Sequence, residues 1–152
     1  MNIYIAGPFS TPECRESLKH MIELVKKRYH NSKPNIYIPM EFKVPGDFQK
    51  PDGTWNLSNE EWAKAVYDSD IEHLNNADVV FAMNIGIYRT AGTVWEMGYA
   101  VGKGIPVYAY IPEWAKGNDM SLMLMNSFKG YLGEDGYISP FAPGELNKYN
   151  QK

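Results

Sequence analysis

Short apolar runs alternate with helical segments along this chain. We expect buried strands at four of these runs, residues 3–6, 35–38, 77–83 and 105–110. We expect helices from Thr11-Pro12 to Tyr29, from a capping box at 58–61 to about Asn76, over 93–103, and a short one over 120–128. Strands separated by helices predict an α/β fold, a parallel sheet with helices on both faces, in a single domain spanning residues 1–152.

The carboxyl ends of the strands are the expected place for a ligand, because open α/β sheets bind ligands there. This rule places residues 6–9, 39–43 and 83–92 around one crevice. Residues 40–57 show no clear period, and loops of this length often bind ligands or close over them. Residues 130–152 are rich in Gly, Pro, Tyr and Asn, which is typical of a C-terminal tail.

Composition narrows the class of partner. A net charge of −3 does not indicate the clustered basic surface that nucleic-acid binding requires. No apolar run approaches the ~20 residues of a membrane span, and no signal-peptide pattern opens the chain, so we expect a cytoplasmic protein. One cysteine, Cys14, excludes an intrachain disulfide and a cysteine-rich metal site, and the three histidines have no ligand spacing. Dinucleotide-binding, P-loop and serine-hydrolase motifs are also absent from the sequence.

Glu96 is the first candidate for chemistry. It follows Thr93 by three residues at the predicted start of a helix, which fits a capping box. The same position faces the crevice, where the helix N-terminus favours an ionised carboxylate that can attack an anomeric carbon. Gly92 and Gly98 beside it fit close approach by a ligand or by another part of the backbone. The pattern alone leaves both roles of Glu96 open.

Asp70 and Tyr4 are the next candidates. Asp70 shares a helix face with Ala63, Val66, Tyr67 and Leu74, and a carboxylate on an apolar stripe requires either a partner or a function. Tyr4 lies near the carboxyl end of the first strand, as a core aromatic or as a hydrogen-bond donor to a crevice carboxylate.

Together these segments resemble the nucleoside 2-deoxyribosyltransferase family from residue 2 to about residue 130. The motifs that carry the resemblance are Tyr4-Ile5-Ala6-Gly7-Pro8-Phe9, Tyr67-x-x-Asp70-Ile71-x-x-Leu74, Ala77-Asp78-Val79-Val80 and Gly92-Thr93-x-x-Glu96-Met97-Gly98-Tyr99-Ala100. The resemblance implies a flavodoxin-like fold and exchange of the base of a 2′-deoxynucleoside with a free nucleobase, without a metal or organic cofactor. It implies that Glu96 is the nucleophile, that Tyr4 holds it, and that Asp70 handles the base and its proton.

Further residues are expected to bind substrate. They are Gly7, Phe9, Glu41, Lys43, Arg89, Thr90, Gly92, Ser121 and Met123. The resemblance also implies a homo-oligomer built from dimers, such as a hexamer, in which a neighbour's C-terminal region closes the site.

The chain departs from the family pattern on the side of the base. Thr90 stands where many members carry an aspartate, Glu41-Phe42-Lys43 stand where Asn-Gln is common, and Ser121 falls near an expected asparagine. Two alternatives to base exchange therefore stay open. One is hydrolysis of a deoxynucleoside or of its 5′-monophosphate, with Arg89 and Lys43 facing the phosphate. The other is a nucleoside-binding module without turnover. The sequence selects neither purines nor pyrimidines.

Overall fold

A computed structural model describes residues 1–43, 60–86 and 90–140. The elements are strands β1 (Asn2–Ala6), β2 (Asn35–Tyr37), β3 (Val79–Met83), β4 (Val107–Tyr110), β5 (Gly130–Leu132) and β6 (Ile138–Ser139), helices α1 (Pro12–Arg28), α2 (Glu60–Asn75), α3 (Ala91–Gly102) and α4 (Leu122–Ser127), and the short 3-10 helices η1 (Pro39–Glu41) and η2 (Glu113–Ala115). The four predicted strands and four predicted helices are all present, and the boundaries that fall on described residues are shifted by at most two residues.

The strands form one six-stranded sheet in the order β2-β1-β3-β4-β5-β6. The first five strands in this order are parallel, and β6 pairs antiparallel with β5. The order 2-1-3-4-5 is that of the flavodoxin-like fold, which confirms the predicted fold class. Its topological switch point lies between β1 and β3, so the crevice for a ligand is expected at the carboxyl ends of these two strands.

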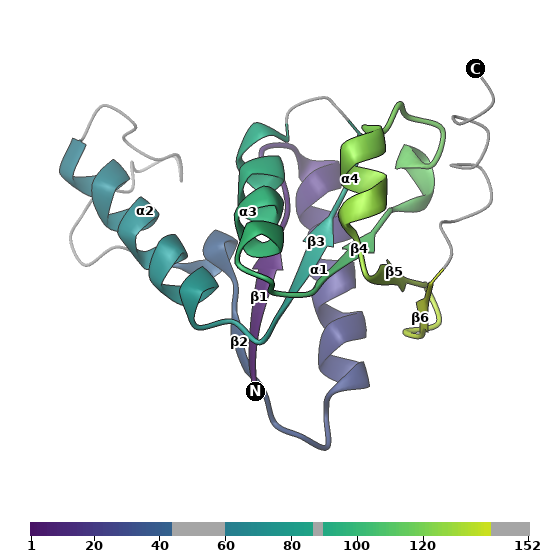
Figure 1. Cartoon of the computed structure of the whole chain (residues 1–152), viewed down its shortest axis with the longest axis horizontal. Helices are drawn as coiled ribbons and strands as arrows, with labels where there is room; N and C mark the ends of the chain where they lie inside the picture. The colour runs from purple at the N-terminus through teal and green to yellow at the C-terminus, as the bar shows by residue number, and fades with distance from the viewer. Residues whose placement is uncertain (44–59, 87–89, 141–152) are drawn as a thin grey trace.

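The two faces of the sheet bury different residues because side chains alternate along a strand. Ile3 and Ile5 of β1 pack in the cluster that includes α1, whereas Tyr4 and Ala6 pack in the cluster that includes Leu74 of α2 together with residues of α3. Figure 1 shows α1 on one face of the sheet and α3 on the other. The central strand β3 is buried along its whole length.

Helix α1 begins as predicted. The Oγ1 atom of Thr11 accepts a hydrogen bond from the backbone N–H of Cys14 at 3.2 Å, and Pro12 occupies the first helical position. Three basic residues in the last turn interact favourably with the helix dipole. The helix therefore has a defined start just after the β1 loop that borders the crevice.

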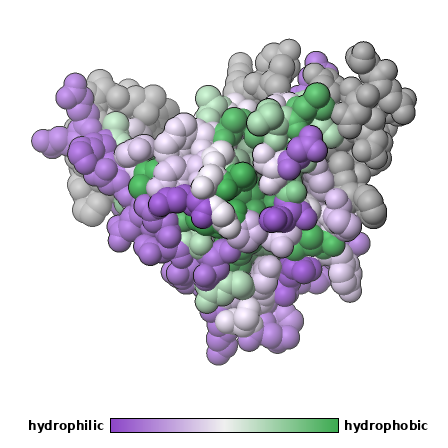
Figure 2. Space-filling model, viewed as in Figure 1, coloured by the Kyte–Doolittle hydropathy of each residue, from purple (hydrophilic) through white to green (hydrophobic). Residues whose placement is uncertain are grey.

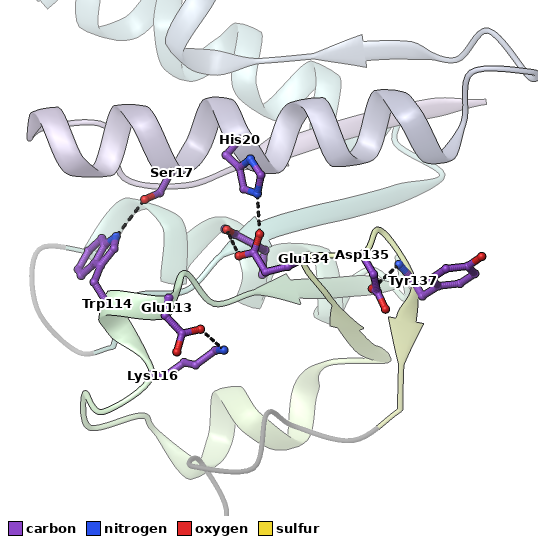
Figure 3. A network of polar contacts seen from close by, with 9 residues as sticks. Ser17, His20, Glu113, Trp114, Lys116, Glu134, Asp135 and Tyr137 are labelled. Atoms are coloured by element: carbon purple, nitrogen blue, oxygen red, sulfur yellow. Dashed lines mark hydrogen bonds and ion pairs between the residues drawn. The ribbon is translucent and has the colours of Figure 1, made fainter.

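The prediction of a C-terminal tail from residue 130 is wrong for its first ten residues. Residues 130–132 and 138–139 are strands, because β5 pairs with β4 and buries Tyr131 and Leu132. His20 on α1 contacts Glu134, which lies between the two strands (Figure 3). Residues 141–152 lie outside the described part of the chain, as do residues 44–57 of the expected lid and 58–59 of the capping box. Within the described ranges, each helix is too short or too polar to cross a lipid bilayer.

Candidate active site

A pocket of about 270 Å³ opens beyond the carboxyl end of β1, between η1, which follows β2, and the start of α3, which follows β3. Its walls come from the loop after β1, from η1, and from one face each of α2 and α3. Asp70, Thr93 and Glu96 place polar side chains in it, among mostly apolar neighbours. The pocket therefore lies where the strand order predicts a ligand crevice.

Glu96 is the sixth residue of α3, because the helix begins at Ala91 and not at Thr93. The first helical hydrogen bond runs from Val94 N–H to the Thr90 carbonyl at 2.8 Å, which makes Thr90 the N-cap residue. The predicted capping box of Thr93 and Glu96 is thus wrong. Thr93 is buried inside the helix, and Glu96 points into the pocket from the second turn.

Tyr4 of β1 holds the Glu96 carboxylate. The phenol Oη donates a hydrogen bond to Glu96 Oε1 at 2.7 Å, and Tyr4 itself is fully buried. Of the two roles left open for Tyr4, the geometry therefore places the phenol on a crevice carboxylate. The bond also orients one carboxylate oxygen and leaves the other without a partner among the described residues.

The pKa of Glu96 is raised to about 7. Burial raises it most, the hydrogen bond from Tyr4 lowers it, and the negative charge of Asp70 raises it. The raised pKa runs against the expectation that the helix N-terminus favours the ionised form of this carboxylate. A second-turn position weakens the dipole effect, and desolvation outweighs it. Near neutral pH the group is poised between its two protonation states.

Asp70 of α2 faces the same pocket and accepts a hydrogen bond at Oδ1 from Tyr37 Oη at 2.8 Å. Burial raises its pKa, while the Tyr37 hydrogen bond and the nearby His73 act in the opposite direction. The predicted apolar stripe around it is only partly correct. Leu74 is buried and Val66 lines the pocket, but Ala63 and Tyr67 are exposed.

The structure places the remaining candidates in four groups. Gly7, Phe9, Thr90 and Gly92 line the pocket. Ser121 and Met123 line a second pocket that shares Thr90 and Gly92 with the first. Glu41 and Lys43 are exposed and line neither pocket. Arg89 lies outside the described residues.

Thr90 has its hydroxyl engaged. Its Oγ1 donates to the Gly86 carbonyl at 3.0 Å, and the side chain is buried. It therefore shapes the junction of the two pockets and offers no carboxylate to a ligand. Gly92 leaves open space, because a Cβ atom built there meets nothing within 4 Å. Packing against the described residues therefore does not require a glycine at position 92.

Tyr37 and His73 were missed by the sequence reasoning. The Tyr37 ring stacks on the His73 ring at 3.6 Å between centroids, and its hydroxyl reaches Asp70. One signal was available: Asn-Ile-Tyr-Ile occurs at both 2–5 and 35–38. No group of three or more metal-binding side chains comes together in the described part of the chain.

Comparison with known proteins places this chain in a family. The sequence model described as Nucleoside 2-deoxyribosyltransferase matches residues 3–135. The chain belongs to this family.

Two curated relatives are nucleoside deoxyribosyltransferases. The protein from Lactobacillus leichmannii is 25% identical over 121 residues, which cover 80% of this chain and 76% of the relative. The protein from Lactobacillus johnsonii is 28% identical over 89 residues, or 59% of each chain.

Two solved structures show how widely the fold is used. A 2-deoxyribosyltransferase from Bacillus psychrosaccharolyticus is similar with a TM-score of 0.71 at 26% identity, over 93% of this chain and all of that one. A CMP N-glycosidase from Clostridium botulinum shares the fold alone, with a TM-score of 0.51 at 16% identity over 99% and 98% of the chains. The fold therefore occurs in proteins named for both transfer and hydrolysis.

Proposed function

We propose that this protein transfers a 2-deoxyribosyl group from a 2′-deoxynucleoside to a free nucleobase through a covalent intermediate on Glu96. The observation that carries the proposal is the Glu96 carboxylate, which Tyr4 holds at 2.7 Å in a pocket that also contains Asp70. Membership of the family supports the reaction class, and the resemblance of the segment around Glu96 to the family's motif implies that Glu96 is the nucleophile.

The proposed reaction has two displacements at C1′. In the first, a Glu96 oxygen forms a bond to C1′, the C1′–N bond breaks, and the base departs with the electron pair and a proton. In the second, a nitrogen of the incoming base attacks C1′, and the ester oxygen leaves as the carboxylate while the base releases its proton. Two inversions give overall retention, as in retaining glycosyl transfer.

Asp70 is the proposed source of the proton for the departing base. The reactive form of the pair carries one proton on Asp70 and one negative charge on Glu96. Protonation of Asp70 removes the negative charge that raises the Glu96 pKa, so the same proton favours an ionised nucleophile. The Tyr4 hydrogen bond also favours the ionised form. The two carboxyl groups thus titrate as a coupled pair.

Hydrolysis of the same N-glycosidic bond is the second candidate. The observation that favours it is Thr90, whose hydroxyl is engaged by the Gly86 carbonyl and which stands where the resemblance leads us to expect an aspartate on the side of the base. A weakly held incoming base would let water open the glycosyl ester. The proposed small-molecule partners are the deoxynucleoside and the base, and no cofactor takes part in either reaction as written.

Assembly into a dimer-based homo-oligomer is part of the proposal. Met123 is 79% exposed and Leu122 50% exposed, and Figure 2 shows hydrophobic residues gathered over α3 and α4 on this face. Exposed apolar patches of this kind suit an interface, and a second copy would cover the pocket at Ser121. The free Cys14 fits a cytoplasmic location.

Base exchange tests the proposed reaction. A deoxynucleoside and a different free base, incubated with the protein, should yield the new nucleoside on chromatography. Glu96→Ala should lower this rate by at least about a thousandfold, because it removes the nucleophile. Glu23→Ala is the matched control, since it removes an exposed carboxylate on α1 and should leave the rate unchanged. Exchange that persists in folded Glu96→Ala contradicts the proposal, and free sugar formed without an acceptor base favours hydrolysis.

A further inference from the structure

The two copies of Asn-Ile-Tyr-Ile lie side by side in the sheet. Residues 2–5 and 35–38 fall on the neighbouring parallel strands β1 and β2, in a register that pairs Tyr4 with Tyr37. Paired residues of parallel strands project from the same face of a sheet. The two phenol rings accordingly lie 5.4 Å apart between centroids, at 34° to one another.

Each tyrosine donates its hydroxyl proton to a carboxylate on a different helix. Tyr4 reaches Glu96 on α3 at 2.7 Å, and Tyr37 reaches Asp70 on α2 at 2.8 Å. Both carboxylates line the same pocket. The repeated tetrapeptide thus gives two equivalent tyrosine–carboxylate pairs, of which the proposed reaction so far uses one.

Contacts with His73 and Ser69 hold the Tyr37 side chain in place. It stacks on His73 at 3.6 Å and 13°, and His73 Nδ1 lies 2.7 Å from the Ser69 carbonyl. Because a carbonyl only accepts, Nδ1 carries the proton and this bond fixes the imidazole plane. Ser69 Oγ lies 3.0 Å from Tyr37 Oη, whose single proton is given to Asp70, so Ser69 donates to Tyr37. These contacts leave the phenol one orientation, toward Asp70.

We propose that Tyr37 is a positioning residue that fixes the Asp70 carboxyl group in the pocket, as Tyr4 fixes Glu96. The inference rests on the proposed function, in which Asp70 handles the proton of the base. Without the Tyr37 hydroxyl, Asp70 keeps its place on α2 but loses the hydrogen bond that orients its carboxyl group. Proton delivery then has a less defined geometry, which costs rate.

The protonation of Asp70 gives a second readout that does not require turnover. The titratable groups facing Asp70 among the described residues are Tyr37 of β2, His73 of its own helix, Tyr4 of β1 and Glu96 of α3. Burial raises the pKa of Asp70, and the Tyr37 hydrogen bond lowers it. Removal of this bond should therefore raise the Asp70 pKa, whereas loss of the ring stack alone would not.

The variant Tyr37→Phe tests the inference, because it removes the hydroxyl and keeps the ring on His73. Tyr110→Phe is the matched control. It also removes a phenol–carboxylate bond, from Tyr110 Oη to Glu134 at 2.6 Å. Glu134 lies in the β5–β6 turn, where it contacts His20 of α1 (Figure 3). Neither residue lines the pocket.

Two measurements are made on the full chain. Carboxyl carbon NMR of protein labelled at aspartate, assigned with Asp70→Asn, should show a higher Asp70 pKa in Tyr37→Phe and no change in Tyr110→Phe. In base exchange, kcat/KM should fall about tenfold in Tyr37→Phe, the effect of losing one hydrogen bond. In an Asp70→Asn background the same substitution should cause less than a twofold further loss, because its effect passes through Asp70.

An unchanged Asp70 titration in Tyr37→Phe would overturn the inference, as would a tenfold loss that persists in the Asp70→Asn background. If the unaltered protein exchanges no bases, the proposed function fails, while the titration still decides whether Tyr37 controls Asp70. Failure of the proposed function and failure of the inference on Tyr37 therefore give different results.

Discussion

Glu96 shows how a single buried carboxylate is set for chemistry at a cost in stability. Desolvation disfavours its charge, so its pKa rises from an ordinary value of 4.5 to about 7. A carboxyl group with a raised pKa binds its proton more tightly in the folded state than in the unfolded state. Its cost is absent below pH 4.5, grows as the pH rises, and is complete above about pH 7.

We expect Glu96→Gln to stabilise the protein in alkaline solution. Glutamine keeps an acceptor for Tyr4 and carries no charge, so the free energy of unfolding at pH 8 should increase by about 3 kcal/mol at most, with little change at pH 4.5. Urea unfolding at the two pH values measures the difference.

Glu134→Gln is the matched control with the opposite sign. Burial disfavours the charge of Glu134, but hydrogen bonds from Tyr110 and His20 outweigh it and lower the pKa. The ionised form therefore stabilises the fold above the ordinary pKa, and this contribution is lost as the pH falls. Glu134→Gln should destabilise the protein at pH 8. Equal stability of Glu96→Gln and the unaltered protein at pH 8 would contradict the account of Glu96.

Helix α3 is the element that joins the two pockets. Gly92 in its first turn lines both, and Glu96 one turn later lines the first. Gly92 and Gly98 both have open space at the Cβ position, and neither has a positive φ. The two glycines therefore have similar backbone and packing environments, and they differ in that Gly92 lines the pockets and Gly98 does not.

Substitution of each glycine by alanine distinguishes an effect on ligand binding from an effect on helix stability. Alanine should be favoured over glycine at both positions, by up to about 1 kcal/mol in the free energy of unfolding. Gly92→Ala should nevertheless raise KM for the deoxynucleoside several-fold, because the new methyl group enters the pocket. Gly98→Ala should leave KM unchanged. Steady-state kinetics with thermal unfolding of both variants checks this, and an unchanged KM in Gly92→Ala would show that substrate does not approach α3 there.

At the scale of the whole molecule, the alternating pattern was sufficient to predict the parallel sheet and its crevice. The strands β5 and β6 were missed because Gly130–Leu132 is short and lies in a segment with the composition of a tail; only pairing with β4 reveals it. The start of α3 was misplaced because Thr90 and Thr93 both suit a cap, and the choice depends on the backbone after β3.

The site was predicted unevenly for a related reason. Glu96, Asp70 and Tyr4 stood out in local patterns, and the structure brings them to one pocket or beside it. Tyr37 did not stand out, because its contact with Asp70 depends on the register of β1 with β2 and on how α2 packs over them. Pairings between separate elements are fixed by tertiary structure, which periodicity along the chain does not encode.

The most direct test of the central claim is trapping of the glycosyl–enzyme intermediate. The protein is incubated with a 2-fluoro-2-deoxy nucleoside, and intact mass followed by peptide mapping locates the bound sugar. We predict one added 2-fluoro-2-deoxyribosyl group on Glu96, absent from Glu96→Ala and released as a new nucleoside when a free base is added. A protein that exchanges bases yet carries no adduct, or carries it on another residue, would contradict the account.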